Sequence, residues 1–314
     1  MLDIIVVDDG SKDKTAEIAN RFVAEYPESV RLISKANGGH GSAVNTGIVA
    51  ATGKYFKVVD GDDRLDKAGL LALLEKLSYT DVDLFVANYR KISLANEKPV
   101  DMRFEGIEYG KIYAFEELPQ SNKIYFGIHS INFKTSILQE HEICLQEHTF
   151  YVDVEYGLLP IPYINTIEFF EPTVYLYYVG SVGQSINMTN FVNKYNDHNR
   201  VVTRMTTYYN EVNCSERQHQ YMLTVLNKLC FTHYMLSIFY DKDKHRAKKR
   251  ALEFDNWLLA NNQEVYRNLA SSLYIKAMRS IGFKVLPPAI LNSAVKKTYD
   301  IIKPIFKKKR KFTY

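Results

Sequence analysis

Three aspartates directly behind a run of β-forming residues could hold a metal ion. The stretch VVDGDD places Asp60, Asp62 and Asp63 within four positions, after the run 54–59. Clustered carboxylates raise one another's pKa unless a cation or hydrogen-bond donors neutralise them. Oxygen ligands favour Mg²⁺ or Mn²⁺, and Mg²⁺ is commonly held by one or two carboxylates together with substrate phosphates. The stretch predicts a metal–diphosphate site; the alternative is that Asp62 or Asp63 caps the following helix.

A second acidic pair, Asp8 and Asp9, ends the apolar run 4–7. Strand and helix patterns alternate along this part of the chain, with strands predicted over 4–7, 30–34, 54–59 and 82–94 and helices around 15–23, 41–51 and 70–77. Ser11 is the expected N-cap of the first helix. Such alternation is typical of an α/β protein with a mostly parallel sheet flanked by helices. Because ligands bind at the carboxyl ends of such strands, the two acidic clusters are expected to converge.

The composition describes an ordinary globular protein made and kept in the cytoplasm. Of 314 residues, 46% are hydrophobic and 24% charged. No run reaches the 18 or so apolar residues of a membrane-spanning helix, and the start lacks a signal-peptide pattern. Three cysteines without a CxxC pair predict neither a disulfide framework nor a thiolate zinc site.

The C-terminal part has a different texture, because long helical patterns replace the strands from about residue 187. We therefore predict a catalytic domain over 1–190 and a helical region over 191–314. From Lys296 onward the chain carries eight basic residues and one acidic residue. Lysines next to apolar residues predict a peripheral contact with an anionic membrane surface on the inner face. A solvated terminus is the alternative, and nucleic acid is not expected because no recognition module accompanies the charge.

The sequences IIVVDDGSKDKT (4–15) and NGGHGSAVNTGIVAATGKYFKVVDGDD (37–63) resemble family 2 glycosyltransferases of the GT-A fold, which carry these elements in this order. The resemblance implies a nucleotide-sugar donor, in particular a UDP-sugar. It places Asp8 or Asp9 against the uracil and Asp60 near the ribose. It also implies that Asp62 holds Mn²⁺ or Mg²⁺ on the diphosphate.

The resemblance further implies a general base in an acidic motif on the acceptor side. The stretch HTFYVDVEYGLLPI (148–161) supplies Asp153 as the predicted base and Glu155 as an accessory residue. As an alternative, both are acids favoured by the dipole at a helix N-terminus. Further candidates for contacts with acceptor or diphosphate are His129, Gln184 and Ser185. The alternatives are a satisfied core or capping histidine and a plain turn.

One departure from the family concerns the first strand. Relatives begin with an additional strand and helix ahead of the DDGS strand, whereas Met1 here directly precedes it, so one edge of the sheet is expected to be open. The leading function is a metal-dependent, inverting hexosyltransferase acting on a saccharide or lipid-linked saccharide in cell-surface polysaccharide biosynthesis. A non-catalytic sugar-nucleotide-binding subunit is the alternative. A nucleotidyltransferase is the third hypothesis, although its glycine-rich triphosphate loop is not visible.

Overall fold

The computed structural model describes residues 2–94, 98–120, 124–180, 194–241 and 243–283, and these form two compact units. The first unit comprises Met1–Val182 and Val212–Met222, and the second comprises Gly183–Glu211 and Leu223–Tyr314. The sequence-based boundary near residue 190 falls in a stretch outside the described residues, and it stays a prediction.

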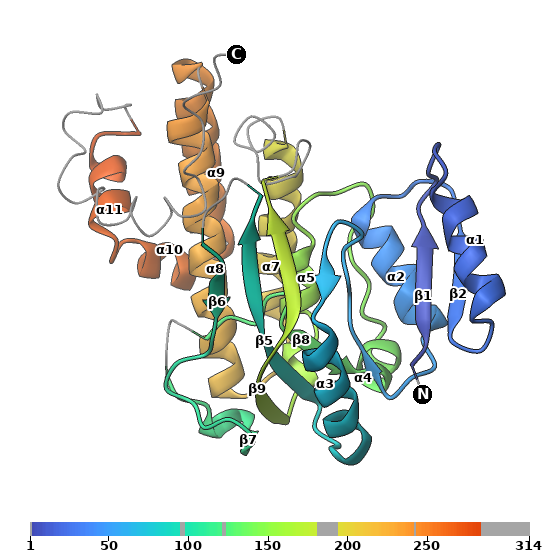
Figure 1. The fold of residues 1–314 in the computed structure, drawn as a ribbon. Coiled ribbons are helices and arrows are strands. Elements are labelled where there is room, and N and C mark those ends of the chain that lie inside the picture. The colour runs from blue at the N-terminus through green and yellow to red at the C-terminus, as the bar shows by residue number, and fades with distance from the viewer. Residues whose placement is uncertain (1, 95–97, 121–123, 181–193, 242, 284–314) are drawn as a thin grey trace. The chain divides into compact units, whose positions relative to one another are not determined.

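The strands of the first unit form two separate sheets (Figure 1). The smaller sheet pairs β1 (Ile4–Asp8) with β2 (Val30–Ser34). The larger sheet has the order β3-β8-β5-β9-β4, with β6 on β5 and β7 on β9. Its strands are β3 (Tyr55–Phe56), β4 (Arg64–Leu65), β5 (Leu84–Ser93), β6 (Val100–Met102), β7 (Ile112–Ala114), β8 (Ile131–Lys134) and β9 (Thr166–Val179).

The sheets are mixed, which corrects the expectation of a mostly parallel sheet. Among the described strands, β1 with β2 and β5 with β9 are parallel, and the other pairings are antiparallel. The expectation came from the first 94 residues, where a helix connects successive strands. Beyond them the chain reverses without a crossover helix, as between β5 and β6, and short reversals give antiparallel neighbours. The strand expected over 54–59 is paired only over the two residues of β3.

The helices of the first unit are α1 (Thr15–Glu25), α2 (His40–Ala50), α3 (Lys67–Tyr79), α4 (Thr135–Glu140) and α5 (Asp153–Leu158), with 3₁₀ turns η1 (Phe115–Glu117) and η2 (Ile161–Tyr163). One capping prediction and one capping alternative were wrong. Ser11 does not cap α1, because the N-cap residue is Lys14 and no side chain caps this helix. Neither Asp62 nor Asp63 caps α3, because the Asp66 carboxylate accepts from Gly69 N (2.8 Å).

The core of the first unit lies between α3 and the strands β5 and β9. Leu73 of α3 packs with Phe85 of β5 and Val174 of β9, all at most 2% exposed. Gly69 makes this close approach possible, since a Cβ at that position would lie 1.9 Å from the carbonyl oxygen of Thr173. Helix α3 is thereby fixed on the sheet, and with it the acidic loop 60–66 directly ahead of it.

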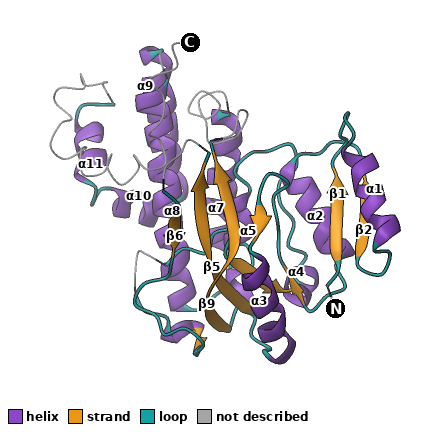
Figure 2. Cartoon of the chain, in the orientation of Figure 1, coloured by secondary structure: helices purple, strands orange, loops and turns teal. Residues whose placement is uncertain are grey.

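The second unit is helical over the residues that the structure describes (Figure 2). Its elements are α7 (Tyr195–Glu211), the larger part of α8 (Glu216–Met235), the π-helical turn η3 (Leu236–Tyr240), α9 (Lys244–Asn261), α10 (Gln263–Leu269) and α11 (Leu273–Ser280). The first turns of α8 belong to the first unit, where the Tyr221 hydroxyl accepts from Phe126 N (2.9 Å). None of the helices in the described part of the chain has the length and hydropathy needed to cross a membrane.

A buried histidine pair, His198 of α7 and His233 of α8, lies in the core of the second unit. Their Nδ1 atoms are 3.0 Å apart, so one donates and the other accepts. Burial lowers the pKa of His198 to about 3. Burial lowers the pKa of His233 further below its ordinary value, and the neighbouring His198 and Arg250 add to the effect. Both rings are therefore neutral in the folded protein at pH values where an unfolded chain takes up protons.

We expect acid to destabilise the second unit through this pair. Below the unfolded histidine pKa of about 6.5 the unfolded state binds more protons, so the free energy of unfolding falls as pH falls, by up to about 1.4 kcal/mol per pH unit for each histidine. Trp257 of α9 is the only tryptophan and reports unfolding of this unit by fluorescence. His198→Asn keeps a hydrogen-bond donor near the Nδ1 position, and its side chain does not titrate. Between pH 6.5 and 5, the free energy of unfolding of this variant should therefore depend less steeply on pH, by about the contribution of one histidine. An unchanged slope would contradict the assignment.

Candidate active site

The carboxylate of Asp9 organises the glycine-rich loop that follows β2. It accepts hydrogen bonds from Gly38 N (2.9 Å), Gly39 N (2.7 Å) and Asn37 Nδ2 (3.0 Å), and it pairs with Lys35 Nζ (3.2 Å). Burial raises the pKa of Asp9, but these donors outweigh it and the net pKa lies below the ordinary value. Because its oxygens are taken up within the chain, Asp9 acts in this structure as a loop anchor.

Asp8, the other carboxylate of the pair, is buried. It ends β1, is 6% exposed, and accepts from Ser11 N through one oxygen (2.9 Å). Hydrogen bonding to Ser11 holds its pKa below the ordinary range, so the carboxylate is charged at neutral pH. Nucleotide binding by Asp8 and Asp9 stays a prediction.

The glycine loop and α2 lie directly against the stretch 145–149. Gly41 permits this contact, since a Cβ there would lie 2.2 Å from the Gln146 carbonyl oxygen. Asn45 and Leu145 exchange two hydrogen bonds, from Asn45 Nδ2 to the Leu145 carbonyl (2.9 Å) and from Leu145 N to Asn45 Oδ1 (2.8 Å). His148 N also donates to the Gly38 carbonyl (2.6 Å). The NGGHG motif therefore lies against the stretch that leads to Asp153.

Glu155 holds the stretch 145–149 in place through hydrogen bonds to Gln146. It is fully buried and accepts from Gln146 N (2.9 Å) and from the Gln146 side-chain amide. Burial among these donors favours a positioning role for Glu155 over the predicted contact with an acceptor. Asp153 has a different environment, because it is half-buried as the first residue of α5.

The backbone ahead of Asp153 is strained, and the general-base role of its carboxylate stays a prediction. His148 and Tyr151 have φ of 49° and 69°, in the left-handed region that side chains other than glycine rarely adopt. Such strain gathers at functional sites. Burial raises the pKa of Asp153; the charge of Asp60 adds to this, and that of His40 opposes it. A raised pKa improves a carboxylate as an acceptor of protons near neutral pH.

His40 links the two acidic stretches. It begins α2, and its Nε2 lies 3.4 Å from the Asp60 carboxylate. Burial lowers the pKa of His40, but Asp60 and the more distant Asp153 outweigh it, so the net pKa is above the ordinary value. The raised pKa means that the imidazole stays protonated to a higher pH than an ordinary histidine.

Asp60, Asp63 and His129 form a candidate metal centre. One ligand atom from each lies within 4.8 Å of the others, and the set is found among the residues that the structure describes. Asp63 also accepts from the Tyr175 hydroxyl (2.7 Å) and from Tyr178 N (2.7 Å). Burial raises the pKa of Asp63 to about 6. Two carboxylates and one imidazole fit Mn²⁺, and the carboxylates alone fit Mg²⁺. The predicted ligand Asp62 is exposed and outside this set, so its role stays a prediction.

His129 is held by aromatic rings and by a buried lysine. Its ring stacks on Tyr177 with centroids 4.0 Å apart and lies against Tyr175 at 5.1 Å, both from β9. Burial lowers the pKa of His129 to about 4, so the ring is neutral, the form that binds metals. Lys57 Nζ donates to the His129 carbonyl (2.9 Å), and burial lowers the pKa of this lysine to about 7.

Sequence reasoning missed several of these groups. Lys57 carried a signal, since it interrupts the β-forming run ahead of Asp60. His40 lies inside the recognised glycine motif and was not predicted to contact the acidic loop at Asp60. Tyr175 and Tyr177 gave no signal, being two tyrosines among 23. The predicted contacts Gln184 and Ser185 lie outside the described residues.

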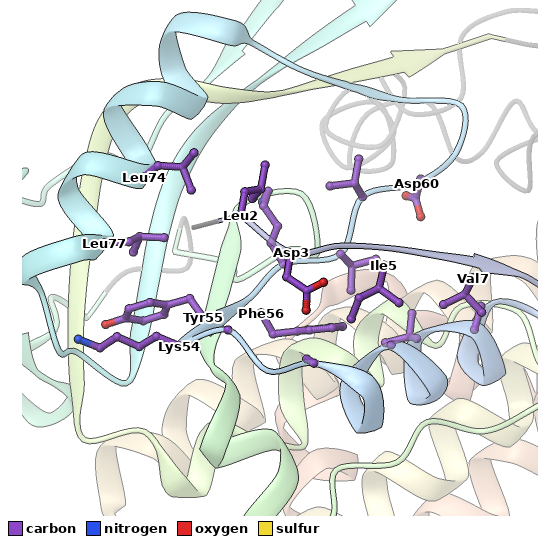
Figure 3. A pocket seen from close by; sticks show the side chains of 18 of the residues that line it. Leu2, Asp3, Ile5, Val7, Lys54, Tyr55, Phe56, Asp60, Leu74 and Leu77 are labelled. Carbon is purple, nitrogen blue, oxygen red and sulfur yellow. The ribbon is translucent and has the colours of Figure 1, made fainter. Parts of the chain in front are cut away.

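The surroundings of Asp60 open into a cavity of about 650 Å³ (Figure 3). Val7 and His40 line it together with Asp60, so the end of β1, the start of α2 and the acidic loop share one space. An α/β sheet with carboxylates at strand ends and a group of potential metal ligands matches sites where phosphorylated ligands bind.

Solved structures share this fold. TarS residues 1–349 of S. aureus, solved with UDP-GlcNAc, align with a TM-score of 0.60 and 15% identity over 90% of this chain and 80% of that one. The mannosyltransferase PcManGT from Pyrobaculum calidifontis, solved with GDP-Man and Mn²⁺, aligns with a TM-score of 0.51 and 13% identity over 98% and 79% of the two chains. The fold is that of GT-A glycosyltransferases, which confirms the α/β prediction.

Sequence comparison gives a family match over part of the chain. The family model for glycosyl transferase family 2 matches residues 2–138. A teichoic acid poly(glycerol phosphate) polymerase of Staphylococcus epidermidis is 27% identical over 164 residues, covering 52% of this chain and 22% of that protein. The chain spans only 22% to 37% of the length of the first five curated relatives that it matches.

Proposed function

We propose that this chain is an inverting glycosyltransferase that moves a sugar from a UDP-sugar to a hydroxyl of a saccharide or lipid-linked saccharide in cell-surface polysaccharide biosynthesis. The observation that carries the proposal is the group Asp60, Asp63 and His129, with His40 joining it to the loop of Asp153. Nucleotide sugars bound to similar folds and the polymerase relative support the donor class and the setting.

In the proposed reaction Asp153 takes the proton of the acceptor hydroxyl as its oxygen attacks the anomeric carbon. The bond between that carbon and the diphosphate breaks, and the electron pair leaves with the nucleoside diphosphate. Attack from the side opposite the leaving group inverts the anomeric centre. A divalent cation at Asp60, Asp63 and His129 would supply positive charge for the departing diphosphate.

Calorimetry tests the donor class. UDP with Mn²⁺ is expected to bind more tightly than ATP with Mg²⁺ by at least about tenfold, roughly 1.4 kcal/mol. Asp8→Asn should weaken UDP binding by about the same factor, because a charged acceptor at the end of β1 is lost. The matched control is Asp13→Asn, since Asp13 is exposed and bonds only within the turn ahead of α1. Equal affinity for the two nucleotides would overturn the donor assignment.

A non-catalytic sugar-nucleotide-binding subunit is the second candidate, and the open edge of β1 favours it. Among the described strands, β1 pairs only with β2, so the wall of the nucleotide pocket beside it is open. Hydrolysis of UDP-sugars separates the two functions. An enzyme releases UDP from at least one donor in the presence of Mn²⁺, whereas the subunit binds UDP with the metal but releases none.

A further inference from the structure

The stretch 124–128 alternates between buried and exposed side chains. Ile124, Phe126 and Ile128 are at most 5% exposed, whereas Tyr125 is 38% exposed. Such alternation is typical of an extended chain, in which successive side chains lie on opposite sides. Tyr125 therefore lies on the side away from the apolar residues that anchor this stretch.

Two glycines allow Tyr125 to lie near Asp153. Gly157 belongs to α5, and a Cβ at that position would lie 2.7 Å from the Phe126 carbonyl oxygen. The stretch that carries Tyr125 therefore packs directly on the helix that Asp153 begins. A Cβ at Gly127 would lie 3.3 Å from the ring carbon Cε1 of Tyr125, so this glycine leaves room for the ring.

Aromatic side chains on the larger sheet form a second group in the same unit. His129 lies against Tyr89 of β5 with ring centroids 5.3 Å apart, and it stacks on Tyr177 of β9 at 4.0 Å. In the parallel register of β5 and β9, Tyr89 and Tyr177 lie two positions apart on one face of the sheet. This row of rings begins at the candidate metal centre, because His129 is one of its three members.

The hydroxyl groups of these tyrosines lie near Asp153. Burial raises the pKa of Tyr125, and the Asp153 carboxylate and Tyr89 add to the effect. Burial also raises the pKa of Tyr177, and Asp63 and Asp153 are the next largest causes. Both pKa values lie above the ordinary tyrosine value of about 10, so these hydroxyls keep their protons at neutral pH and can donate as well as accept hydrogen bonds.

An exposed aromatic ring beside several hydroxyl groups suits the ring of a pyranose sugar. The face of an aromatic ring is negative, and the C–H groups on one face of a pyranose carry slight positive charge, so the two rings stack. The hydroxyl groups of the sugar need hydrogen-bond partners, which tyrosine hydroxyls supply. An open-chain polyol phosphate has no flat C–H face, and its phosphate would bring a second negative charge to Asp153.

We propose that Tyr125 binds the acceptor by stacking on a pyranose ring, while Tyr89 and Tyr177 bind the hydroxyl groups of that ring beside Asp153. The acceptor is then a saccharide that ends in a pyranose, and not a polyol phosphate. The inference rests on the proposed function for the role of the bound sugar as acceptor. Binding of the sugar itself can be measured without that function.

Saturation-transfer difference NMR tests the binding of the sugar without donor or metal. The probes are the methyl pyranosides of glucose, galactose, mannose and N-acetylglucosamine, and glycerol 3-phosphate is the contrasting probe. We expect at least one pyranoside to bind to the chain 1–314 and glycerol 3-phosphate not to bind. Tyr125→Ala should raise the Kd of that pyranoside by about tenfold, which corresponds to about 1.4 kcal/mol. Tyr125→Phe keeps the ring and should keep most of the affinity.

Tyr79→Ala is the matched control, because Tyr79 is an exposed tyrosine at the end of α3 and does not belong to the row of rings. It should leave the Kd of the pyranoside unchanged. An equal loss in Tyr79→Ala and Tyr125→Ala would contradict a specific site at Tyr125.

Four other results would overturn the proposal. They are the absence of binding by all four pyranosides, tighter binding of glycerol 3-phosphate than of any pyranoside, an unchanged Kd in Tyr125→Ala, and an equal loss in Tyr125→Phe and Tyr125→Ala. Sugar transfer to the bound pyranoside is a separate readout, in which Tyr125→Ala should raise KM for the acceptor by about tenfold. If a pyranoside binds through Tyr125 but no UDP-sugar supports transfer, the proposed function fails and the saccharide site remains.

Discussion

Asp153→Asn is expected to lower kcat for sugar transfer by about 10²- to 10⁴-fold, the contribution of a positioned general base. The asparagine fills the same volume but cannot take the proton from the acceptor hydroxyl. UDP affinity should not change, because the lost interaction belongs to the transition state and not to donor binding. Steady-state kinetics together with UDP calorimetry on the same preparation separate the two quantities.

Glu155→Gln is the matched control, two residues away on α5. Its carboxylate accepts two hydrogen bonds from Gln146, so the amide should lower stability through an unsatisfied contact while kcat falls less than in Asp153→Asn. The pH dependence gives a second check. Since the pKa of Asp153 is raised, kcat should fall on the acid side at a pH above the ordinary range of aspartate, and this limb should be absent in Asp153→Asn. Equal losses in both variants would contradict the role of Asp153.

The first part of the fold was predictable because its signals are local. A continuous apolar run that ends in aspartates predicted β1. The small residues that follow the glycines predicted α2. The mixed larger sheet was not predictable, because β8 and β9 pair with β5 over long sequence separations. Those pairings depend on which strand edges are still unpaired when the later strands reach the sheet. The periodicity of hydrophobic residues in the sequence does not contain this information.

The candidate site, like the fold, was predicted only where its signals are local in the sequence. Asp60 was placed at the site because its motif is contiguous. Asp62 was preferred to Asp63 because the resemblance to family 2 glycosyltransferases implied Asp62 as the metal ligand. The chain turns at this point, with Asp63 N donating to the Asp60 carbonyl (3.0 Å), and a turn brings residues three apart together. His129 was predicted only as a candidate contact for acceptor or diphosphate, and neither spacing nor composition marked it as a metal ligand.

Asp63→Asn is expected to weaken Mn²⁺ binding by at least about 10- to 100-fold, the loss found even for groups that only support a ligand. Asp60 and His129 alone offer one charge fewer to a cation. Binding is measured by electron paramagnetic resonance of free Mn²⁺, with and without UDP. The wild-type affinity should itself fall below pH 6, by up to about tenfold per pH unit, because Asp63 with a pKa of about 6 must lose its proton before it can act as a ligand.

Asp62→Asn is the decisive control. It removes the same charge as Asp63→Asn, but from the neighbouring residue, which is exposed and does not belong to the group of Asp60, Asp63 and His129. If Asp63 is the ligand, Asp62→Asn lowers affinity only by the loss of a nearby charge, about 1 kcal/mol or less at a solvated distance. A larger effect of Asp62→Asn than of Asp63→Asn would move the metal to the exposed side of the loop. His129→Phe then decides between the two arrangements, because it keeps the stack on Tyr177 and should weaken Mn²⁺ binding only where the imidazole is a ligand.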